Sequence, residues 1–317
     1  MAYQTGDTIL DDHYNGFAND NSPNNINKIW GTGSGNYGYG QSNTISTVTP
    51  GTTVTATQWN TLLDRMQSVK NHQGSSISTG AGTLSGGDPI QAILTISSDI
   101  TTLGTNRYNV SGGNLTQTSN PNSVNRTFTG SWSASTVHEV SFSFASGDAM
   151  RYFFNAGGKI THVWNLSGGT ADGKYNEWVD LFNTLSATFT FGNTFDSLSG
   201  SGTPSTNLNE GHWGATLNTA YAVYQKQFAD TAPYTTNYCQ WEVKSNGTQG
   251  ANGDKGSVLT IKASAVDAAA DEAFDPNLDI VDGTLTSSWS YFKPNTTYLN
   301  NDAVGTITAA EVSQSQS

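Results

Sequence analysis

The sequence is poor in cysteine and in charge. It has one cysteine, Cys239, in 317 residues, and only 12% of its side chains are charged. A single cysteine excludes an intrachain disulfide and any zinc site built from cysteines. Low charge together with 11% aromatic residues argues against solvating disorder, which requires high net charge and few aromatics. The chain is therefore expected to fold around a hydrophobic core.

Basic residues are outnumbered, and the net charge is −12. A chain this acidic lacks the electrostatic footprint that binds phosphate backbones. The same charge disfavours anionic membrane surfaces. We expect no nucleic acid and no membrane among its partners.

Long apolar runs and a leader sequence are also missing. No run reaches the length of a membrane span. Residues 1–14 have neither the basic nor the apolar region of a signal peptide. We expect synthesis in a cytoplasm and solubility there, after which the protein could leave the cell by lysis or as part of a particle.

Catalytic motifs are not found. The sequence has no Gly-x-Ser-x-Gly elbow, no phosphate-binding loop and no His-Glu-x-x-His pair. The five histidines do not stand at metal-ligand spacing; they are His13, His72, His138, His162 and His212. His162 falls on the apolar face of an expected strand and is interpreted as a hydrogen-bonded core residue. We expect no enzyme activity, no cofactor and no metal.

Two sets of carboxylates are candidates for a function that this expectation excludes. Five acidic residues neighbour aromatics and are candidates for glycan hydrolysis, which needs two facing carboxylates; they are Asp172, Glu177, Asp180, Glu210 and Glu242. Three aspartates could offer oxygen ligands to calcium but lack EF-hand spacing; they are Asp275, Asp279 and Asp282. A solvated acidic loop is the favoured interpretation of the second set.

What the sequence does contain predicts a β-rich protein. It has 34 glycines, many Ser and Thr, and aromatics at 11%, which together are typical of strands joined by many turns. The length fits one large domain or two ordinary ones. Strands are expected near 137–144, 219–228, 234–244, 257–264 and 284–292, where apolar residues alternate or turns separate apolar runs.

One amphipathic helix is clearly signalled near the N-terminus. Thr55 and Gln58 stand at capping-box spacing. The apolar stripe that follows is Trp59, Leu62, Leu63, Met66 and Val69. It has no local partner, so either the later domain or another protein chain must bury it. We predict that this stripe is an assembly interface.

The region 148–191 holds the densest aromatic and aliphatic residues. It is expected to form a helix from Asp148, a strand over 159–166, a second helix with Trp178 on its apolar face, and a strand. The predicted fold is therefore mainly β with a few helices (α+β): a helical N-terminal segment over 1–105, then an antiparallel sandwich-like body over 106–317 that carries this helix-strand-helix insert.

Two segments resemble virion structural proteins of tailed bacteriophages, notably the cyanophage-type myoviruses. The first is VTATQWNTLLDRMQSVKNHQG, and the second is MRYFFNAGGKI with the later NEWVDLFNTL. The resemblance implies a structural component of the tail, neck, baseplate or fibre region, located in the virion. It marks no catalytic site, and Lys159 and the GGTADGK loop depart from the family pattern.

Three functions follow, and they belong to different classes. The first is a structural subunit that assembles as a homo-oligomer and with other virion proteins. The second is a module that binds host-surface glycan by stacking sugars on exposed tryptophans, for which the candidates are Trp132, Trp164, Trp178, Trp213 and Trp241. The third, least favoured, is a glycan depolymerase that uses two of the carboxylates above.

Overall fold

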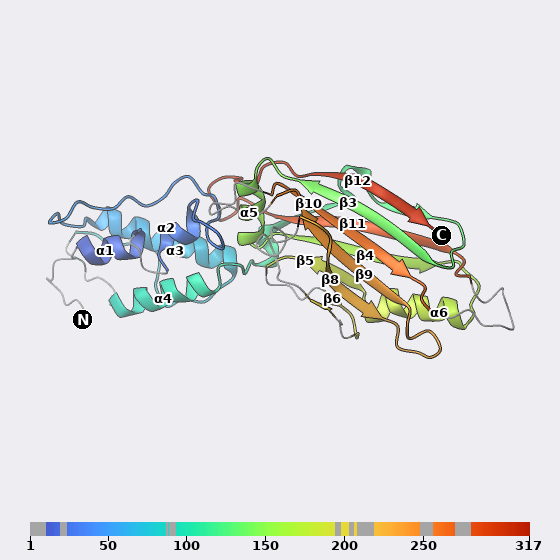
Figure 1. Ribbon diagram of the computed structural model, residues 1–317. Coiled ribbons are helices and arrows are strands. Elements are labelled where there is room, and N and C mark those ends of the chain that lie inside the picture. The colour runs from blue at the N-terminus through green and yellow to red at the C-terminus, as the bar shows by residue number, and fades with distance from the viewer. Residues whose placement is uncertain are drawn as a thin grey trace. The chain divides into compact units, whose positions relative to one another are not determined.

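The computed structural model describes residues 11–19, 24–86, 88, 93–193, 198–202, 206–207, 219–247, 256–269 and 280–317. The described residues form two compact units, each with its own core (Figure 1). Unit 1 comprises Met1–Thr116, Arg151–Gly157 and Lys293–Val304. Unit 2 comprises Gln117–Met150, Gly158–Phe292 and Gly305–Ser317. The division differs from the predicted boundary after residue 105, because two later segments return to the N-terminal unit.

Unit 1 is built from four helices: α1 (Asp11–Ala18), α2 (Ile26–Trp30), α3 (Ala56–Gln73) and α4 (Ile93–Thr105). Helix α3 begins and ends as the sequence predicts. Thr55 and Gln58 form the complete capping box, and Gly74 closes the helix at φ +70° in the left-handed region that glycine adopts without strain.

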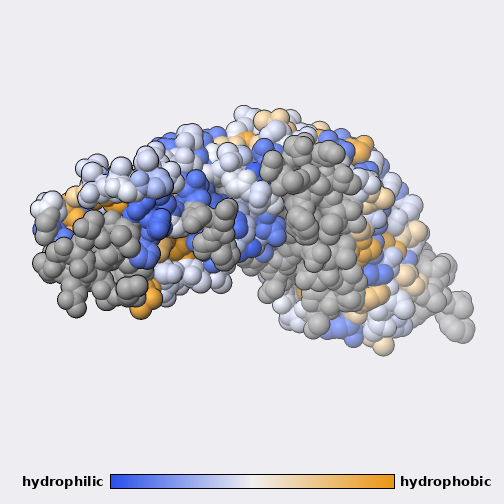
Figure 2. Space-filling view, turned by 60° about the vertical axis from the view of Figure 1, so that its left-hand side comes forward, coloured by the Kyte–Doolittle hydropathy of each residue, from blue (hydrophilic) through white to orange (hydrophobic). Residues whose placement is uncertain are grey.

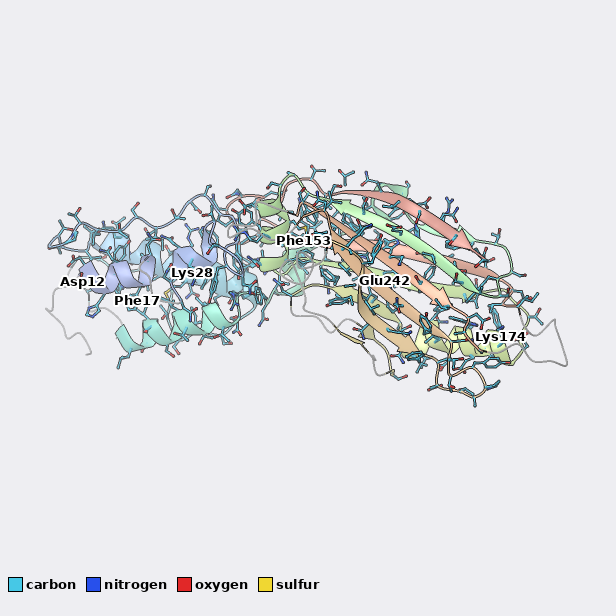
Figure 3. The ribbon with its side chains drawn as sticks, in the orientation of Figure 1. Asp12, Phe17, Lys28, Phe153, Lys174 and Glu242 are labelled. Carbon is cyan, nitrogen blue, oxygen red and sulfur yellow. The ribbon has the colours of Figure 1, made fainter. Side chains whose placement is uncertain are left out.

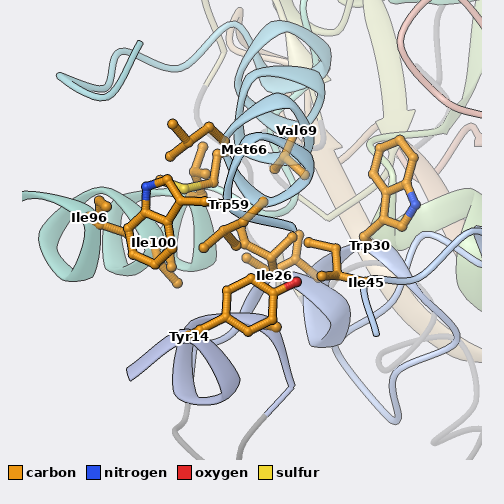
Figure 4. Packing of buried hydrophobic residues seen from close by; sticks show 14 of the residues in the cluster. Tyr14, Ile26, Trp30, Ile45, Trp59, Met66, Val69, Ile96 and Ile100 are labelled. Atoms are coloured by element: carbon orange, nitrogen blue, oxygen red, sulfur yellow. The ribbon is translucent and has the colours of Figure 1, made fainter. Parts of the chain in front are cut away.

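The apolar stripe of α3 lies inside the core of unit 1 (Figure 4). Trp59, Leu62, Met66 and Val69 are fully buried, and Leu63 is 4% exposed. Helices α1, α2 and α4 cover it. Burying such a side chain contributes about 1.5–3 kcal/mol, so turning the whole stripe outward would cost on the order of 10 kcal/mol. The predicted assembly interface at these five residues is therefore corrected: they are the core of the chain's own unit.

The glycine-rich stretch 31–40 is also part of unit 1. The sequence predicts that it needs a neighbour to hold it, and that neighbour is the returning segment 151–157. Arg151 donates to the carbonyls of Tyr37, at 2.5 Å, and Thr32, at 2.7 Å. The Asn155 amide donates to the carbonyls of Gly35 and Tyr37, both at 3.1 Å. These bonds hold the backbone of the loop, while Tyr39 is buried in the core of unit 1 and Tyr37 packs against that core.

Unit 2 is a sandwich of two six-stranded antiparallel sheets, which confirms the predicted fold class. The first sheet has the order β1-β11-β4-β5-β6, with β2 also paired to β11. Its strands are β1 (Leu115–Ser119), β2 (Arg126–Phe128), β4 (Lys159–Ser167), β5 (Thr188–Phe191), β6 (Leu198–Ser199) and β11 (Thr284–Pro294). The second sheet has the order β12-β3-β10-β9-β8-β7. Its strands are β3 (Ser135–Ser143), β7 (Thr206–Asn207), β8 (Ala222–Phe228), β9 (Tyr238–Ser245), β10 (Val258–Val266) and β12 (Thr308–Gln316).

The predicted insert is present and supplies elements to both units. Helix α5 (Gly147–Asn155) leads into β4, and helix α6 (Gly173–Asp180) continues as a π-helical turn (Leu181–Leu185) before β5. The sequence offers Asp148 as the N-cap of this helix, but the cap of α5 is Ser146, whose Oγ accepts the Ala149 N–H at 3.0 Å. Short 3-10 turns lie at Gly112–Asn114 and Pro121–Ser123.

The C-terminal residues form a strand of the second sheet. The sequence suggests a small polar tail, loosely held or docked on a neighbour. Instead β12 pairs with β3 along its whole length, with one bulge between Glu311 and Ser313. The outer edge of β12 also has partners: the Asn122 side chain accepts the Ala309 N–H at 2.9 Å, and the Gln316 amide donates to the Gly130 carbonyl at 2.7 Å.

Candidate functional site

The predicted sugar-stacking tryptophans are core residues. Trp132, Trp164, Trp178 and Trp241 are each no more than 2% exposed. Trp132 and Trp178 pack edge to face with ring centroids 4.6 Å apart, and Trp241 stacks on Phe189 at 4.9 Å. A buried ring cannot stack on a sugar, so the prediction is corrected for these four. The fifth, Trp213, lies outside the described residues.

A hydrogen-bonded chain of side chains crosses the core of the sandwich. The Trp241 indole N–H donates to Nδ1 of His162 at 3.0 Å. Nε2 of His162 lies 2.7 Å from Oγ of Ser287, and the same Oγ lies 2.7 Å from Nδ1 of His138. The Trp289 indole N–H also points at that Nδ1, at 3.2 Å. The interpretation of His162 as a hydrogen-bonded core histidine is confirmed.

The hydrogen-bond donors in this network determine which ring nitrogen of each histidine carries the proton. Because Nδ1 of His162 accepts from an indole, its Nε2 must carry the proton and donate to Ser287. Ser287 can then donate its own proton to Nδ1 of His138, which accepts from Trp289 as well. All members are fully buried except the indole of Trp241, which is 1% exposed. The arrangement has the residue types of a nucleophilic site, but its hydroxyl is sealed from any substrate.

Burial keeps both histidines neutral. Loss of hydration lowers the pKa of His138 to about 4, and the positive charge of Arg126 lowers it further. Loss of hydration, followed by the effect of His138, places the pKa of His162 well below its usual value. A neutral polar network in a core favours one packing arrangement, because any shift breaks several hydrogen bonds together. Among the described residues, one atom of this network has no hydrogen-bond partner: Nε2 of His138, which lies 3.5 Å from a carboxylate oxygen of Glu311.

The candidate carboxylates have structural partners. Asp172 caps α6 by accepting the Tyr175 N–H at 2.7 Å, and Glu242 forms an ion pair with Lys262. Asp282 accepts from the backbone and the hydroxyl of Thr170, which lowers its pKa. Glu210, Asp275 and Asp279 lie outside the described residues.

Three carboxylates lie close together at the end of α6. Oxygens of Glu177, Asp180 and Asp230 lie within 4.8 Å of one another. Glu177 is 6% exposed, and one of its oxygens accepts the N–H groups of Asp230, at 3.0 Å, and Thr231, at 3.1 Å. The carboxylate of Glu177 therefore holds the turn after β8. The two hydrogen bonds also compensate its burial, because a buried polar or charged group needs hydrogen-bond partners.

The first segment of the phage resemblance and the RYFFNAG part of the second meet within unit 1. Nε2 of His72, from the NHQG end of α3, lies 3.0 Å from the carbonyl of Ala156, in the RYFFNAGG block. The next residue, Gln73, donates to the Tyr39 hydroxyl and to the Leu103 carbonyl, both at 2.9 Å. Burial lowers the pKa of His72 to about 4, so this contact forms with a neutral ring. Sequence reasoning identified these motifs as family markers but missed that they bind each other.

Two of the surface hollows of unit 1 lie beside helices α1 and α2. The larger, about 670 Å³, is lined by polar residues that include Asn27, Lys28 and Thr44. The smaller, about 270 Å³, lies between α1 and α4 beside Phe17 and the 68% exposed Leu94. Figure 3 shows the α1 residues Asp12 and Phe17 with Lys28 of α2. Neither hollow gathers the convergent polar and titratable groups that mark an active site.

The outer face of the second sheet is charged and aromatic. In register across β3, β10 and β9 lie Glu139, Lys262 and Glu242, an alternating row of charges. The Tyr221 hydroxyl donates to Glu139, and Lys244 lies 4.0 Å from the Tyr221 ring centre. Opposite charges in adjacent strands stabilise a solvated sheet face. Figure 3 places Glu242 on this sheet.

The outer face of the first sheet is different: apart from Lys159 and Phe292, which pair at one end, the outward residues of β4, β5 and β11 are small and uncharged. Inward residues alternate with outward ones along β4, β5 and β11. Eight outward residues form what we call the hydroxyl face: Thr161, Val163, Asn165, Thr188, Thr190, Thr286, Ser288 and Ser290. All eight are partly or fully exposed.

Comparison with known protein families, with curated proteins and with solved structures finds no match. Among the described residues, no helix is long and apolar enough to cross a membrane. Hydrophobic surface, shown in Figure 2, occurs in small separate spots on the face in view.

Proposed function

We propose that the chain is a structural subunit of a tailed-bacteriophage particle, located in its tail, neck, baseplate or fibre region, and that it acts through protein–protein assembly. The observation that best supports this proposal is the position of the two family-like segments. The first segment and the RYFFNAG part of the second meet in unit 1, where His72 contacts Ala156 while Arg151 and Asn155 hold the glycine-rich loop. Their side chains bind backbone carbonyls, which suits residues that build a frame.

The described chemistry supports this proposal over catalysis. The histidines and serine that resemble a nucleophilic site are sealed in the core, and the described candidate carboxylates cap helices, hold turns or form ion pairs. What the described chain offers to a partner is therefore extended surface, including two contrasting sheet faces.

Particles of the virus that encodes the chain provide the test. Particles purified through a density gradient are digested and quantified by mass spectrometry. The expected result is the chain at a fixed copy number relative to the other particle proteins, retained after a high-salt wash. Its absence from washed particles, despite its presence in the infected lysate, would refute the proposal.

Glycan binding is the second candidate, and it now rests on other residues. Phe228 is 36% exposed and packs 5.5 Å from Tyr238 on the outer face of the second sheet, with the Lys226 ammonium 3.4 Å from the Tyr238 ring centre. Exposed rings on a sheet face can stack on sugars. Binding of the full chain to host polysaccharide, lost in Phe228→Ala but kept in Val312→Ala, would establish this role.

A further inference from the structure

We infer that unit 1 carries a binding site for an acidic sugar residue of the uronate type, centred on Arg65 of helix α3. The site is a third surface hollow, of about 240 Å³, and all its lining residues belong to unit 1. Those that the argument uses are Trp30, Asn43, Arg65, Ser68, Thr297 and Tyr298. The site is separate from the exposed ring of Phe228, which belongs to unit 2. The inference goes beyond the proposed particle role and does not depend on it.

The first observation is that Arg65 has no acidic partner. Acidic side chains outnumber basic ones by 25 to 13, and yet Arg65 forms no ion pair with any carboxylate among the described residues. The other arginines are occupied: Arg126 pairs with a glutamate, while Arg107 and Arg151 donate to backbone carbonyls. In the described part of the chain, one of the five N–H groups of Arg65 has an acceptor, the side chain of Asn43. The other four are left for a ligand or for water.

The second observation is that the guanidinium is held in one orientation. It stacks on the indole of Trp30, 4.0 Å from the ring centre, and that indole is 1% exposed (Figure 4). Nη1 of Arg65 and the Trp30 indole N–H both donate to Oδ1 of Asn43, at 2.8 Å and 2.9 Å. Because the amide oxygen accepts both bonds, the amide nitrogen of Asn43 offers two further N–H donors. A group that is fixed before binding loses little conformational entropy when a ligand arrives.

The third observation concerns the charge of Arg65, which favours a carboxylate. Loss of hydration lowers the pKa of Arg65 to about 10, so the group still carries its charge at neutral pH. A partly dehydrated charge attracts an anion more strongly than a charge in bulk water does. The planar fork of a guanidinium matches the two oxygens of a carboxylate. A monoanion also suits this chain better than a dianionic phosphate, because the net charge of −12 repels the higher charge more.

The rest of the lining favours a sugar ring as the carrier of that carboxylate. Tyr298 is 41% exposed, so its ring offers a surface on which the C–H face of a sugar can stack. Ser68 and Thr297 add hydroxyl groups that can pair with sugar hydroxyls. The hollow is smaller than the roughly 300–1,000 Å³ of typical ligand pockets, which fits one compact ring. An Asp or Glu side chain of a partner protein has neither ring nor hydroxyls and would leave Tyr298 unused.

Titration of the full chain with free glucuronate, followed by NMR, tests the inference. The signal to follow is the Nε–H resonance of Arg65, which is assigned by its loss in Arg65→Lys. We expect it to shift with a Kd on the order of 1 mM, as the binding free energy per atom of small ligands implies. Neutral glucose should not shift it. Acetate should bind about fivefold more weakly than glucuronate, because it has no ring to stack on Tyr298.

Three variants separate the parts of the site, and the backbone amide signals of the lining residues follow the same titrations. Arg65→Lys keeps the charge but loses the fork, and it should weaken glucuronate binding about tenfold. Tyr298→Ala should weaken glucuronate about fivefold and leave acetate unchanged. The matched control is Phe228→Ala, which removes a ring of similar exposure, 36%, from unit 2 and should change neither. Thermal melting checks the folding of each variant.

Three results would overturn the inference. One is an Arg65 resonance that does not move at tens of millimolar glucuronate. Another is Arg65→Lys binding glucuronate as well as wild type. The third is acetate binding as tightly as glucuronate with Tyr298→Ala changing neither, because the hollow would then take a bare carboxylate such as an acidic side chain of a partner protein. The particle role is decided separately, by the protein content of washed particles.

Discussion

Ser287 is the residue on which the buried network of the sandwich depends. Its Oγ lies 2.7 Å from both His162 and His138, and no part of it is exposed. Replacing Ser287 by Ala removes both bonds and leaves the Nε2–H of His162 without an acceptor. Each lost bond costs about 1 kcal/mol, and the stranded buried donor costs about 1–3 kcal/mol more. We expect Ser287→Ala to lower the free energy of unfolding by roughly 3 kcal/mol.

Urea unfolding followed by tryptophan fluorescence measures this loss, because Trp241 and Trp289 donate to the two histidines of the network. The control is Ser290→Ala on the same strand, which removes the same hydroxyl from the outward side. Both are measured at the same low protein concentration. Ser290→Ala should change stability by less than about 0.5 kcal/mol. If Ser287→Ala costs no more than its control, the hydrogen-bonded chain does not stabilise the fold and the proton assignment fails.

Three further predictions concern other parts of the chain. The folded pKa of His138, about 4, lies below its unfolded value of about 6.5. The contribution of His138 to the free energy of unfolding is therefore complete above pH 6.5, and it falls by about 1.4 kcal/mol per pH unit as the pH is lowered toward 4. His138→Gln should flatten that part of the profile of urea midpoint against pH. Arg151→Lys should fail to hold the glycine-rich loop, because one ammonium cannot reproduce the planar fork that reaches Thr32 and Tyr37, and amide hydrogen exchange over residues 31–40 should accelerate as in Arg151→Met. Thr55→Ala should destabilise unit 1 by about 1 kcal/mol through loss of the capping box, whereas a melting temperature equal to that of wild type would contradict it.

Local signals in the sequence determined most elements of this protein. The capping box at Thr55 and the closing Gly74 are interactions between neighbours in the chain, so helix α3 could be predicted with both its ends. Alternation along β3, β4 and β9 needs only the period of a strand, which is why the sandwich-like body was also predictable. The core role of His162 followed from its place on an apolar strand face.

Which apolar and aromatic side chains lie inside the core was decided by the tertiary structure alone. Periodicity shows that Trp59 needs a partner, but only the fold shows that α1, α2 and α4 provide it. The aromatic content favours core packing but is compatible with sugar stacking, and long-range contacts decided for packing at Trp132 and Trp241. The hydroxyl face joins residues of three strands that are up to 129 positions apart, between Thr161 and Ser290. No local pattern marks such a face, because it exists only after antiparallel pairing has brought the strands into register.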